Sequence, residues 1–429
     1  MAATPLPLAI SIAPFPEGFQ GDMDETFQQA VQLMTGTIAG SFLTGLILPP
    51  GSTLPTTDQG PIAMGGTWYF FDPVSGQYLP QSATVKPAKN FARNCVYQVA
   101  QQGLTFTLGA GTTQTYDMAI ARSPLANVLA INQVGGPPAG TNADNINSAI
   151  NFTVGPNLVA TPGASDLYTH EHLIEGSDIA MIQGQITTLS FWIWVNVAGV
   201  YSAYLTNGGR DRSYVFNFTI AAAQASTWVR VIVPAIPAFP STGTWSYGEG
   251  QTGLYLGFPM CVGTQWQTSS LGSWQSALYA GSPQNINMLT VLNNRMSITG
   301  IKFEASPAAS FLQVPSFETD FNEVLRYYYT TFTYQSTGAG VAIMGVAHVA
   351  AAAIISSLFP RRMCKVPTVV PYSSSTFASG NVRNSTTAAD VAVATLPATA
   401  KGVFGGPTVT GAVAGNVITC LVRADARLS

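Results

Sequence analysis

Four aromatic residues lie in loops rich in Gly, Ser and Gln, where their rings could contact a ligand. Trp245 and Tyr247 share one such segment, and Trp266 and Trp274 share the next. A flat apolar ring beside neutral amide and hydroxyl groups suits a sugar, because the ring covers the C–H face while the polar groups bond the hydroxyls. The alternative is that these rings pack at the ends of a domain or at subunit contacts. The pattern predicts carbohydrate or receptor binding at these four residues.

Carboxylates are the other residues that could act on a polysaccharide. A glycosidase needs two carboxyl groups at a defined separation, and no spacing along this chain brings two acids together. No G-x-S-x-G elbow, phosphate-binding loop or dinucleotide fingerprint stands out either. We therefore expect no catalytic residues and no enzymatic activity. The candidate acids that a polysaccharide depolymerase would draw on are Asp211, Glu249, Glu304, Glu318 and Asp320.

The elements that position these residues belong to a chain with very little charge. Charged residues make up 9% of its 429 residues and hydrophobic residues 47%, whereas an ordinary domain carries about 25% charged residues. A surface of Ser, Thr, Asn, Gln and Gly repels other copies weakly and offers few lysines to block open strand edges. We therefore expect a permanent homo-oligomer, with a trimer as the favoured assembly. The net charge of −3 and the absence of a basic stripe predict no nucleic-acid partner.

Period-two hydrophobic patterns predict a chain built mainly of β-strands. Leu189–Val195 places Leu189, Phe191, Ile193 and Val195 on one face, and Ser213–Ile220 alternates in the same way. Such runs separated by Gly- and Asn-rich turns indicate an antiparallel β-sandwich, jelly-roll-like, over residues 89–315. Further strands are predicted at Thr227–Val233, Gly253–Phe258 and Met296–Ala305.

Two smaller regions flank the predicted sandwich. Residues 1–88 combine a proline-rich arm, a helix over Asp22–Gly40 and a hairpin within WYFFDPVSGQYLP, which together predict a small α/β attachment module. Ser316 is a helix N-cap candidate, so a short helix should open a C-terminal β domain at 316–429. The PTVV at 367–370 and the PTVT at 407–410 should each open a strand there.

An uncharged segment, Gly338–Phe359, has the length of a membrane span. It is rich in Ala and Gly and holds His348 at its middle, so two short strands are expected, with His348 in a core or interface and no membrane insertion. The N-terminus lacks the basic region of a signal peptide. Four widely spaced cysteines predict buried, reduced thiols in a protein assembled in a reducing cytoplasm: Cys95, Cys261, Cys364 and Cys420.

Several segments of the sequence resemble a β-sandwich found repeatedly in tail-fibre and other virion structural proteins of tailed bacteriophages. They are TLSFWIWVNVAGVYSAYLTNGGRDRSYVFNFTI, the upstream NFARNCVYQVAQQG and LIEGSDIA, the later SITGIKFEAS and SFETDFNEVLRYYY, and the final VRADARLS, which together span about residues 90–429. The resemblance implies a virion structural protein, a tail fibre or similar appendage, assembled in the host cytoplasm. It implies host adhesion or particle assembly without catalysis or cofactor, with other virion proteins bound through residues 1–88 and a host surface glycan as a further partner. A depolymerase tailspike and a head decoration, collar or baseplate connector remain alternatives.

The resemblance also raises a metal site at His170 and His172. In trimeric phage fibres a His-x-His pair from each of three chains can hold one metal ion on the threefold axis, and six imidazoles would suit an octahedral iron-type site. The other interpretation is a polar strand or loop at the surface, because Asp166, Glu171 and Glu175 lie nearby. We favour the surface interpretation and predict no metal.

Overall fold

The computed structural model describes residues 88–138, 146–332 and 340–428 with their side chains, and four earlier strands as backbone. The chain forms two compact units, Met1–Lys86 and Pro87–Ser429. Within the first unit, the predicted hairpin is confirmed, and the helix predicted at Asp22–Gly40 lies outside the described residues. Its four-stranded sheet contains β1 (Leu46–Leu48), β2 (Ile62–Met64), β3 (Thr67–Asp72) and β4 (Gln77–Gln81).

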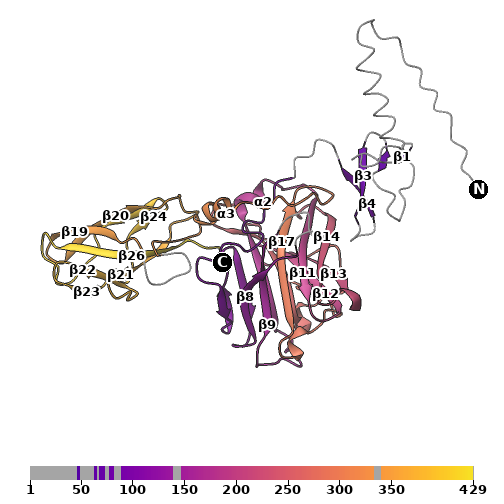
Figure 1. The fold of residues 1–429 in the computed structure, drawn as a ribbon, viewed down its shortest axis with the longest axis horizontal. Helices are drawn as coiled ribbons and strands as arrows, with labels where there is room; N and C mark the ends of the chain where they lie inside the picture. The colour runs from indigo at the N-terminus through magenta and orange to yellow at the C-terminus, as the bar shows by residue number, and fades with distance from the viewer. Residues whose placement is uncertain are drawn as a thin grey trace, which may run out of the picture. The chain divides into compact units, whose positions relative to one another are not determined.

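The second unit begins with two antiparallel sheets stacked as a β-sandwich (Figure 1). The chain passes repeatedly from one sheet to the other, as in jelly rolls, so neighbouring strands are often far apart in sequence. The larger sheet has seven strands in the order β16 (Trp274–Gln275), β13 (Ser213–Ile220), β12 (Gly199–Asn207), β15 (Thr252–Val262), β10 (Leu167–Glu175), β7 (Ala119–Ser123) and β6 (Gly111–Gln114). The other has six, in the order β14 (Trp228–Ile236), β11 (Thr187–Val195), β17 (Arg295–Glu304), β9 (Ser148–Val154), β8 (Leu129–Gly135) and β5 (Thr105–Thr107).

The sandwich core lies between these two sheets and contains the predicted inward-facing residues. Leu189, Phe191, Ile193 and Val195 of β11 are all buried there. The Phe191 ring meets Phe258 of the opposite sheet edge to face, with ring centroids 4.9 Å apart. Such pairs of aromatic rings tie the two layers together through apolar burial and favourable ring geometry. The predicted antiparallel sandwich is therefore confirmed.

The prediction that the four cysteines are buried and form no disulfide is also confirmed. All four are free and buried in the structure. Burial raises the pKa of the Cys261 thiol to about 12, so it stays protonated and unreactive at neutral pH.

The C-terminal region of the second unit is a nine-stranded sheet centred on β26 (Val417–Asp425). It follows α3 (Phe317–Val324), whose N-cap is Ser316, as predicted: the Ser316 hydroxyl accepts a hydrogen bond from the Thr319 amide at 3.3 Å. The predicted strand at PTVV is confirmed as β21, whereas PTVT forms only a single bridge from Thr408 to Ala352. The other strands are β18 (Tyr328–Thr330), β19 (Ile343–Val349), β20 (Ala352–Leu358), β21 (Thr368–Ser373), β22 (Asn381–Asn384), β23 (Ala389–Ala392), β24 (Ala398–Thr399) and β25 (Gly402–Gly405).

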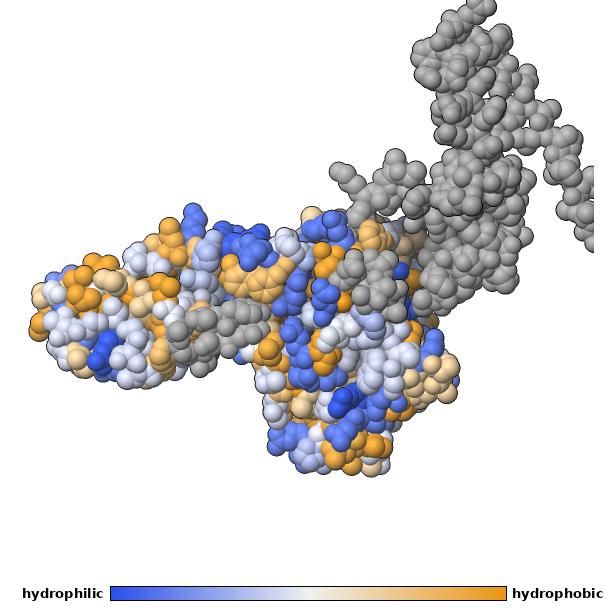
Figure 2. Space-filling view, viewed as in Figure 1, coloured by the Kyte–Doolittle hydropathy of each residue, from blue (hydrophilic) through white to orange (hydrophobic). Residues whose placement is uncertain are grey.

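One face of this sheet is apolar and exposed. The uncharged segment forms the antiparallel pair β19 and β20, as predicted, with Ala347 and Ile355 turned to the core. The opposite face leaves hydrophobic side chains in solvent, and Figure 2 shows orange surface where Figure 1 places these strands. His348 is exposed on this face, so it does not lie in the core, and its place in a subunit interface stays a prediction. In the described residues, no helix combines the length and apolar character needed to cross a membrane. The hydrophobic side chains that this face exposes, with their exposed fractions, are Met344 (66%), Val346 (50%), Ile354 (53%), Leu358 (69%) and Phe404 (41%).

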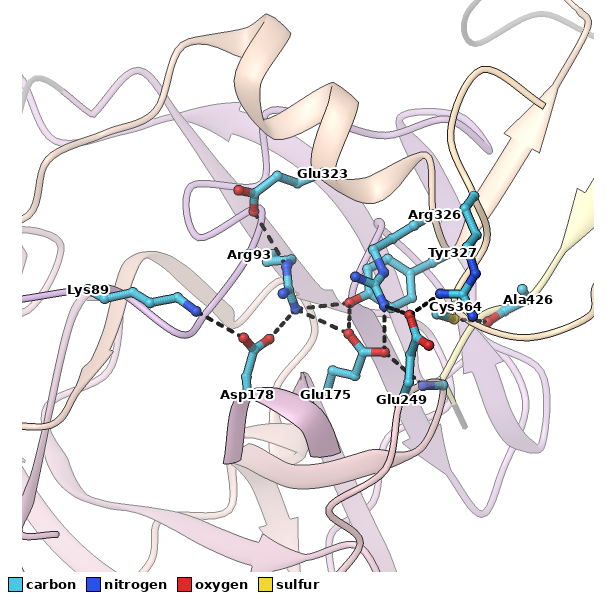
Figure 3. Close-up of polar contacts among 12 residues, drawn as sticks. Lys89, Arg93, Glu175, Asp178, Glu249, Glu323, Arg326, Tyr327, Cys364 and Ala426 are labelled. Atoms are coloured by element: carbon cyan, nitrogen blue, oxygen red, sulfur yellow. Dashed lines mark hydrogen bonds and ion pairs between the residues drawn. The ribbon is translucent and has the colours of Figure 1, made fainter. Parts of the chain in front are cut away.

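A buried charge network joins the sandwich to the C-terminal sheet (Figure 3). Glu175, at the end of β10, is fully buried, and its carboxylate accepts from the Tyr327 hydroxyl at 2.7 Å and the Gly250 amide at 2.7 Å. Arg326 lies 3.0 Å away and Arg93 3.7 Å away, so both guanidinium groups face this carboxylate. Because Arg326 and Tyr327 follow α3, this carboxylate of the sandwich helps to hold the start of the C-terminal sheet in place, together with Glu249, which also pairs with Arg326.

We expect Glu175→Gln to destabilise the protein by about 3–5 kcal/mol, because it removes one partner of a buried ion pair and leaves two guanidinium groups facing a neutral amide. Chemical denaturation followed by tryptophan fluorescence measures the loss. Glu318→Gln is the control, since Glu318 is an exposed acid in the first turn of α3 and should cost less than about 1 kcal/mol. Equal stability of Glu175→Gln and wild type would contradict this account of the joint.

Candidate carbohydrate-binding site

Three of the four sequence-predicted aromatic residues come together at one end of the sandwich. Trp245 and Tyr247 are nearly parallel, with ring centroids 6.4 Å apart and an interplanar angle of 9°. Trp245 stands edge to face with Trp274 at 5.6 Å. Phe239, which the sequence did not single out, stacks on Trp245 at 4.8 Å. These four residues form what we call the aromatic cluster.

Hydrogen bonds hold the two indoles of the aromatic cluster in place. Trp245 donates its Nε1 proton to the Thr242 carbonyl at 3.1 Å, and Trp274 donates to the Pro237 carbonyl at 3.0 Å. Trp274 lies in β16, which pairs with β13 at Tyr214. Because their N–H groups are satisfied within the protein, the indoles can offer a ligand only the exposed part of their apolar rings.

Trp266 lies outside the aromatic cluster. It sits in the 3-10 helix η2 (Thr264–Trp266) and donates its Nε1 proton to the Ser165 carbonyl at 2.8 Å. Its ring packs on a small second group of buried residues that includes Tyr204 and Val215. The structure thus gathers three of the predicted residues and separates the fourth.

A surface pocket of about 400 Å³ opens beside Trp274, a volume within the range of pockets that bind small ligands. Its walls are mostly neutral: Trp274 and Tyr279 supply rings, and Gln275, Ser276 and Thr242 supply amide and hydroxyl groups. An aromatic face next to neutral donors and acceptors is the arrangement that the sequence predicted for sugar contact. The remaining lining residues are Arg212 and Pro240.

The loop that carries Trp245 is anchored by Asp211. The Asp211 carboxylate accepts hydrogen bonds from the Thr244 amide at 3.0 Å and the Thr244 hydroxyl at 2.8 Å, and from the Asn207 amide group at 2.7 Å. These bonds, the Thr244 amide first among them, lower the pKa of Asp211 to about 2. Asp211 is therefore ionised at neutral pH and fixes the neighbour of Trp245 to the β12–β13 turn.

A buried carboxylate on β10, that of Glu171, fixes the β12–β13 turn. Arg210 adopts a left-handed conformation with φ of 54°, which is unfavourable for a non-glycine residue. Its guanidinium donates to both Glu171 oxygens, at 2.7 and 2.6 Å. Arg122 donates to Glu171 at 2.8 Å, and Tyr204 donates at 2.6 Å. Although burial opposes its ionisation, the bonds and charge of Arg210 lower the pKa of Glu171 to about 2.

A glycine makes room for the tyrosine of this arrangement. Gly257 lies directly opposite Tyr204 in the β12–β15 pairing. A Cβ at Gly257 would stand 2.0 Å from the Tyr204 ring, so an alanine there would push the ring away. The Tyr204 hydroxyl reaches Glu171 because this position of β15 carries no side chain.

Four of the five candidate acids for a depolymerase are held by separate interactions, and the fifth, Glu318, is exposed. Glu304 forms a buried pair with Lys302 at 3.2 Å, and Asp320 accepts from Gln98 at 2.6 Å. Glu249 bonds Arg326 and Arg362, at 2.9 and 2.6 Å. Asp211 anchors the Trp245 loop, and Glu318 is an exposed residue of α3.

The surface interpretation of His170 and His172 is wrong. Both side chains are fully buried inside the sandwich, on the inward face of β10. The Tyr97 hydroxyl lies 2.7 Å from Nε2 of His170 and 3.3 Å from Nδ1 of His172. Burial lowers the pKa of both imidazoles to about 3, so both are neutral at pH 7. Among the described residues, no group of three His, Cys, Asp or Glu side chains is arranged to hold a metal ion.

Comparisons with known proteins give only distant structural similarity. No protein-family model and no curated protein matches the sequence. The similar solved structures include tailspike protein 4 of bacteriophage CBA120, in its enzymatically active domain, with TM-score 0.26 and 10% identity; the match covers 50% of this chain and 21% of that chain.

Two further matches are sugar-binding proteins by their names. A putative sugar-binding protein from Bacteroides thetaiotaomicron has TM-score 0.26 and 10% identity over 51% of this chain and 100% of its own. A family 11 carbohydrate-binding module from Clostridium thermocellum has TM-score 0.26 and 10% identity over 49% of this chain and 99% of its own. Similarity at this level assigns neither a family nor a function to this chain.

The buried histidines predict a loss of stability in mild acid. Their folded pKa of about 3 lies below the ordinary value of 6.5, so the unfolded chain binds more protons and unfolding becomes easier as the pH falls from 6.5 toward 3. From pH 7 to pH 5 each histidine should lower the free energy of unfolding by about 2 kcal/mol. Urea unfolding at both pH values measures this change.

The comparison protein is the double variant His170→Gln, His172→Gln, which cannot titrate at these positions. It should lose less stability than wild type between pH 7 and pH 5, whatever its stability at pH 7. Asp117, whose pKa burial raises to about 6, acts in the opposite direction but equally in both proteins. The same pH dependence in wild type and variant would show that the two imidazoles are not buried in neutral form.

Proposed function

We propose that this chain is a glycan-binding structural protein of the tail-fibre type in tailed bacteriophages. It acts in host adhesion, without catalysis or cofactor, by binding a surface sugar in the pocket beside Trp274. The observation that carries this proposal is the joining of Trp245, Tyr247 and Trp274 in one aromatic cluster next to a mostly neutral pocket. Rings held by internal hydrogen bonds lose little conformational freedom when a ligand binds.

The virion role is supported by the sequence. The strings that resemble tail-fibre sandwiches include β11, β12, β13 and β17 of the described structure. The low charge of the chain favours a permanent assembly over a free monomer. In this proposal residues 1–88 attach the chain to other virion proteins, and the sandwich carries the pocket that meets the host.

A homotrimer is part of the same proposal. Met344, Ile354 and Leu358 leave an apolar sheet face open to solvent, and an exposed patch of this kind marks an interaction surface in most soluble proteins. Because the chain has few charges with which to keep copies apart, a second and third copy of the same sheet are the natural cover for that face.

We expect Trp274→Ala to weaken adsorption to host cells, and binding to the host glycan, by about tenfold or more, because the pocket loses its largest ring. Cell adsorption and isothermal titration calorimetry measure the two effects. Trp266→Ala is the matched control. It removes an indole from the segment that also carries Trp274, but not from the aromatic cluster, and it should bind as wild type does.

Thermal unfolding of both variants separates a binding defect from a folding defect. Tyr279→Ala provides a second test, because it removes the other ring of the pocket. If Trp274→Ala and Tyr279→Ala both adsorb normally, the sugar-binding proposal is wrong, and the chain is better described as a connector or decoration protein of the particle.

The oligomer is tested by light scattering. A homotrimer of the 45.1 kDa chain should appear at three times that mass, and Ile354→Lys together with Leu358→Lys should lower the mass, because buried unpaired lysines are costly. Thr387→Lys, in an exposed turn away from this face, is the matched control and should leave the mass unchanged. A monomer at micromolar wild-type concentration would contradict the proposal.

A further inference from the structure

The pocket beside Trp274 contains one charged group. Among the residues that line it, Arg212 is the only one with a charge, and the others supply rings, hydroxyls, an amide and a proline. Arg212 lies directly after Asp211, at the point where the β12–β13 turn enters β13 (Ser213–Ile220). Its position is therefore fixed by the same turn that holds the Trp245 loop.

The guanidinium of Arg212 is oriented by neutral groups. Nε donates to the Thr242 hydroxyl at 3.3 Å, and Nη1 donates to the Asp211 carbonyl at 2.6 Å. An arginine has five N–H donors, so these two bonds set the plane of the group and leave donors for a ligand. Thr242 also lines the pocket, which places this end of the guanidinium at the pocket wall.

No carboxylate neutralises Arg212 at close range in the described residues. The ion pairs within 4.0 Å among these residues involve other arginines and lysines: Arg122 and Arg210, for example, both pair with Glu171. The nearest acid in sequence, Asp211, directs its carboxylate to Thr244 and Asn207. The field of Arg212 helps to lower the pKa of Asp211, yet the two groups do not form an ion pair.

We infer that the pocket selects a sugar unit that carries a carboxylate, such as a hexuronic or sialic acid. This inference rests on the proposed glycan-binding function. The planar fork of a guanidinium matches a carboxylate with two parallel hydrogen bonds. The pyranose ring then lies against Trp274 or Tyr279, and its hydroxyls meet Ser276 and Thr242 at the pocket wall.

A glycan array tests the inference with wild type, Arg212→Gln and Trp274→Ala. The array carries oligosaccharides that contain hexuronic acid or sialic acid, and neutral oligosaccharides of matched length. Wild type should bind carboxylate-bearing glycans best, and chemical reduction of the carboxyl group in the best ligand should weaken binding about tenfold or more. Arg212→Gln should show the same loss on the unreduced glycan and no further loss on the reduced one.

Arg212→Lys distinguishes charge from geometry. A lysine keeps the positive charge but cannot form the two-pronged bond, so its affinity should fall between those of wild type and Arg212→Gln. Equal thermal midpoints of the three proteins would show that the fold is unchanged, as expected for a part-exposed side chain.

The possible outcomes separate this inference from the proposed function. If wild type prefers neutral glycans, and Trp274→Ala abolishes that binding while Arg212→Gln does not, the pocket binds sugar but the inference about the carboxylate is wrong. If wild type binds no glycan, or Trp274→Ala binds as wild type does, the proposed function fails and the inference fails with it.

Discussion

The ion pair between Glu171 and Arg210 is the interaction on which the rest of the site depends. Glu171 is fully buried on the outer face of β10, and a buried carboxylate is tolerated only when charge and hydrogen bonds compensate for the lost water. Arg210, Arg122 and Tyr204 provide that compensation. In return, the pair holds Arg210 in a left-handed turn that the backbone alone would avoid.

The positions of the residues around the pocket depend on this ion pair. The turn that Arg210 closes also presents Asp211, which fixes Thr244 and with it the loop of Trp245. Trp245 in turn stands edge to face with Trp274, the ring that borders the pocket. A site held by such a chain of contacts is formed before a ligand arrives, so little ordering is required on binding. In the proposed function, the apolar strands of the C-terminal sheet serve assembly, and a few buried charges hold the recognition site in place.

Much of the fold could be predicted from the sequence, because its strands follow a period of two. The segments around Phe191 and Phe216 alternate so clearly that their inward faces were assigned correctly. The sequence places β10 at the surface, as a polar strand or loop, because His170 and His172 occupy inward positions where apolar residues are expected. The alternation of Tyr168, His170, His172 and Ile174 was the available signal. The PTVT segment does not form the predicted strand, because Thr408 makes a single β-bridge that no further pairing extends into a ladder.

The site itself was only partly predictable. Loop composition identified Trp245 and Trp274. Phe239 and Tyr279 lie close to them in sequence but belong to no pattern that singles them out, and Arg212 joins them from the distant β12–β13 turn. The central claim is that the pocket beside Trp274 is the place where this protein meets a sugar. A crystal structure of the protein with a bound oligosaccharide tests it most directly. The account predicts a sugar ring against Trp274 or Tyr279 with the aromatic cluster unmoved, and a sugar bound elsewhere on the protein would contradict it.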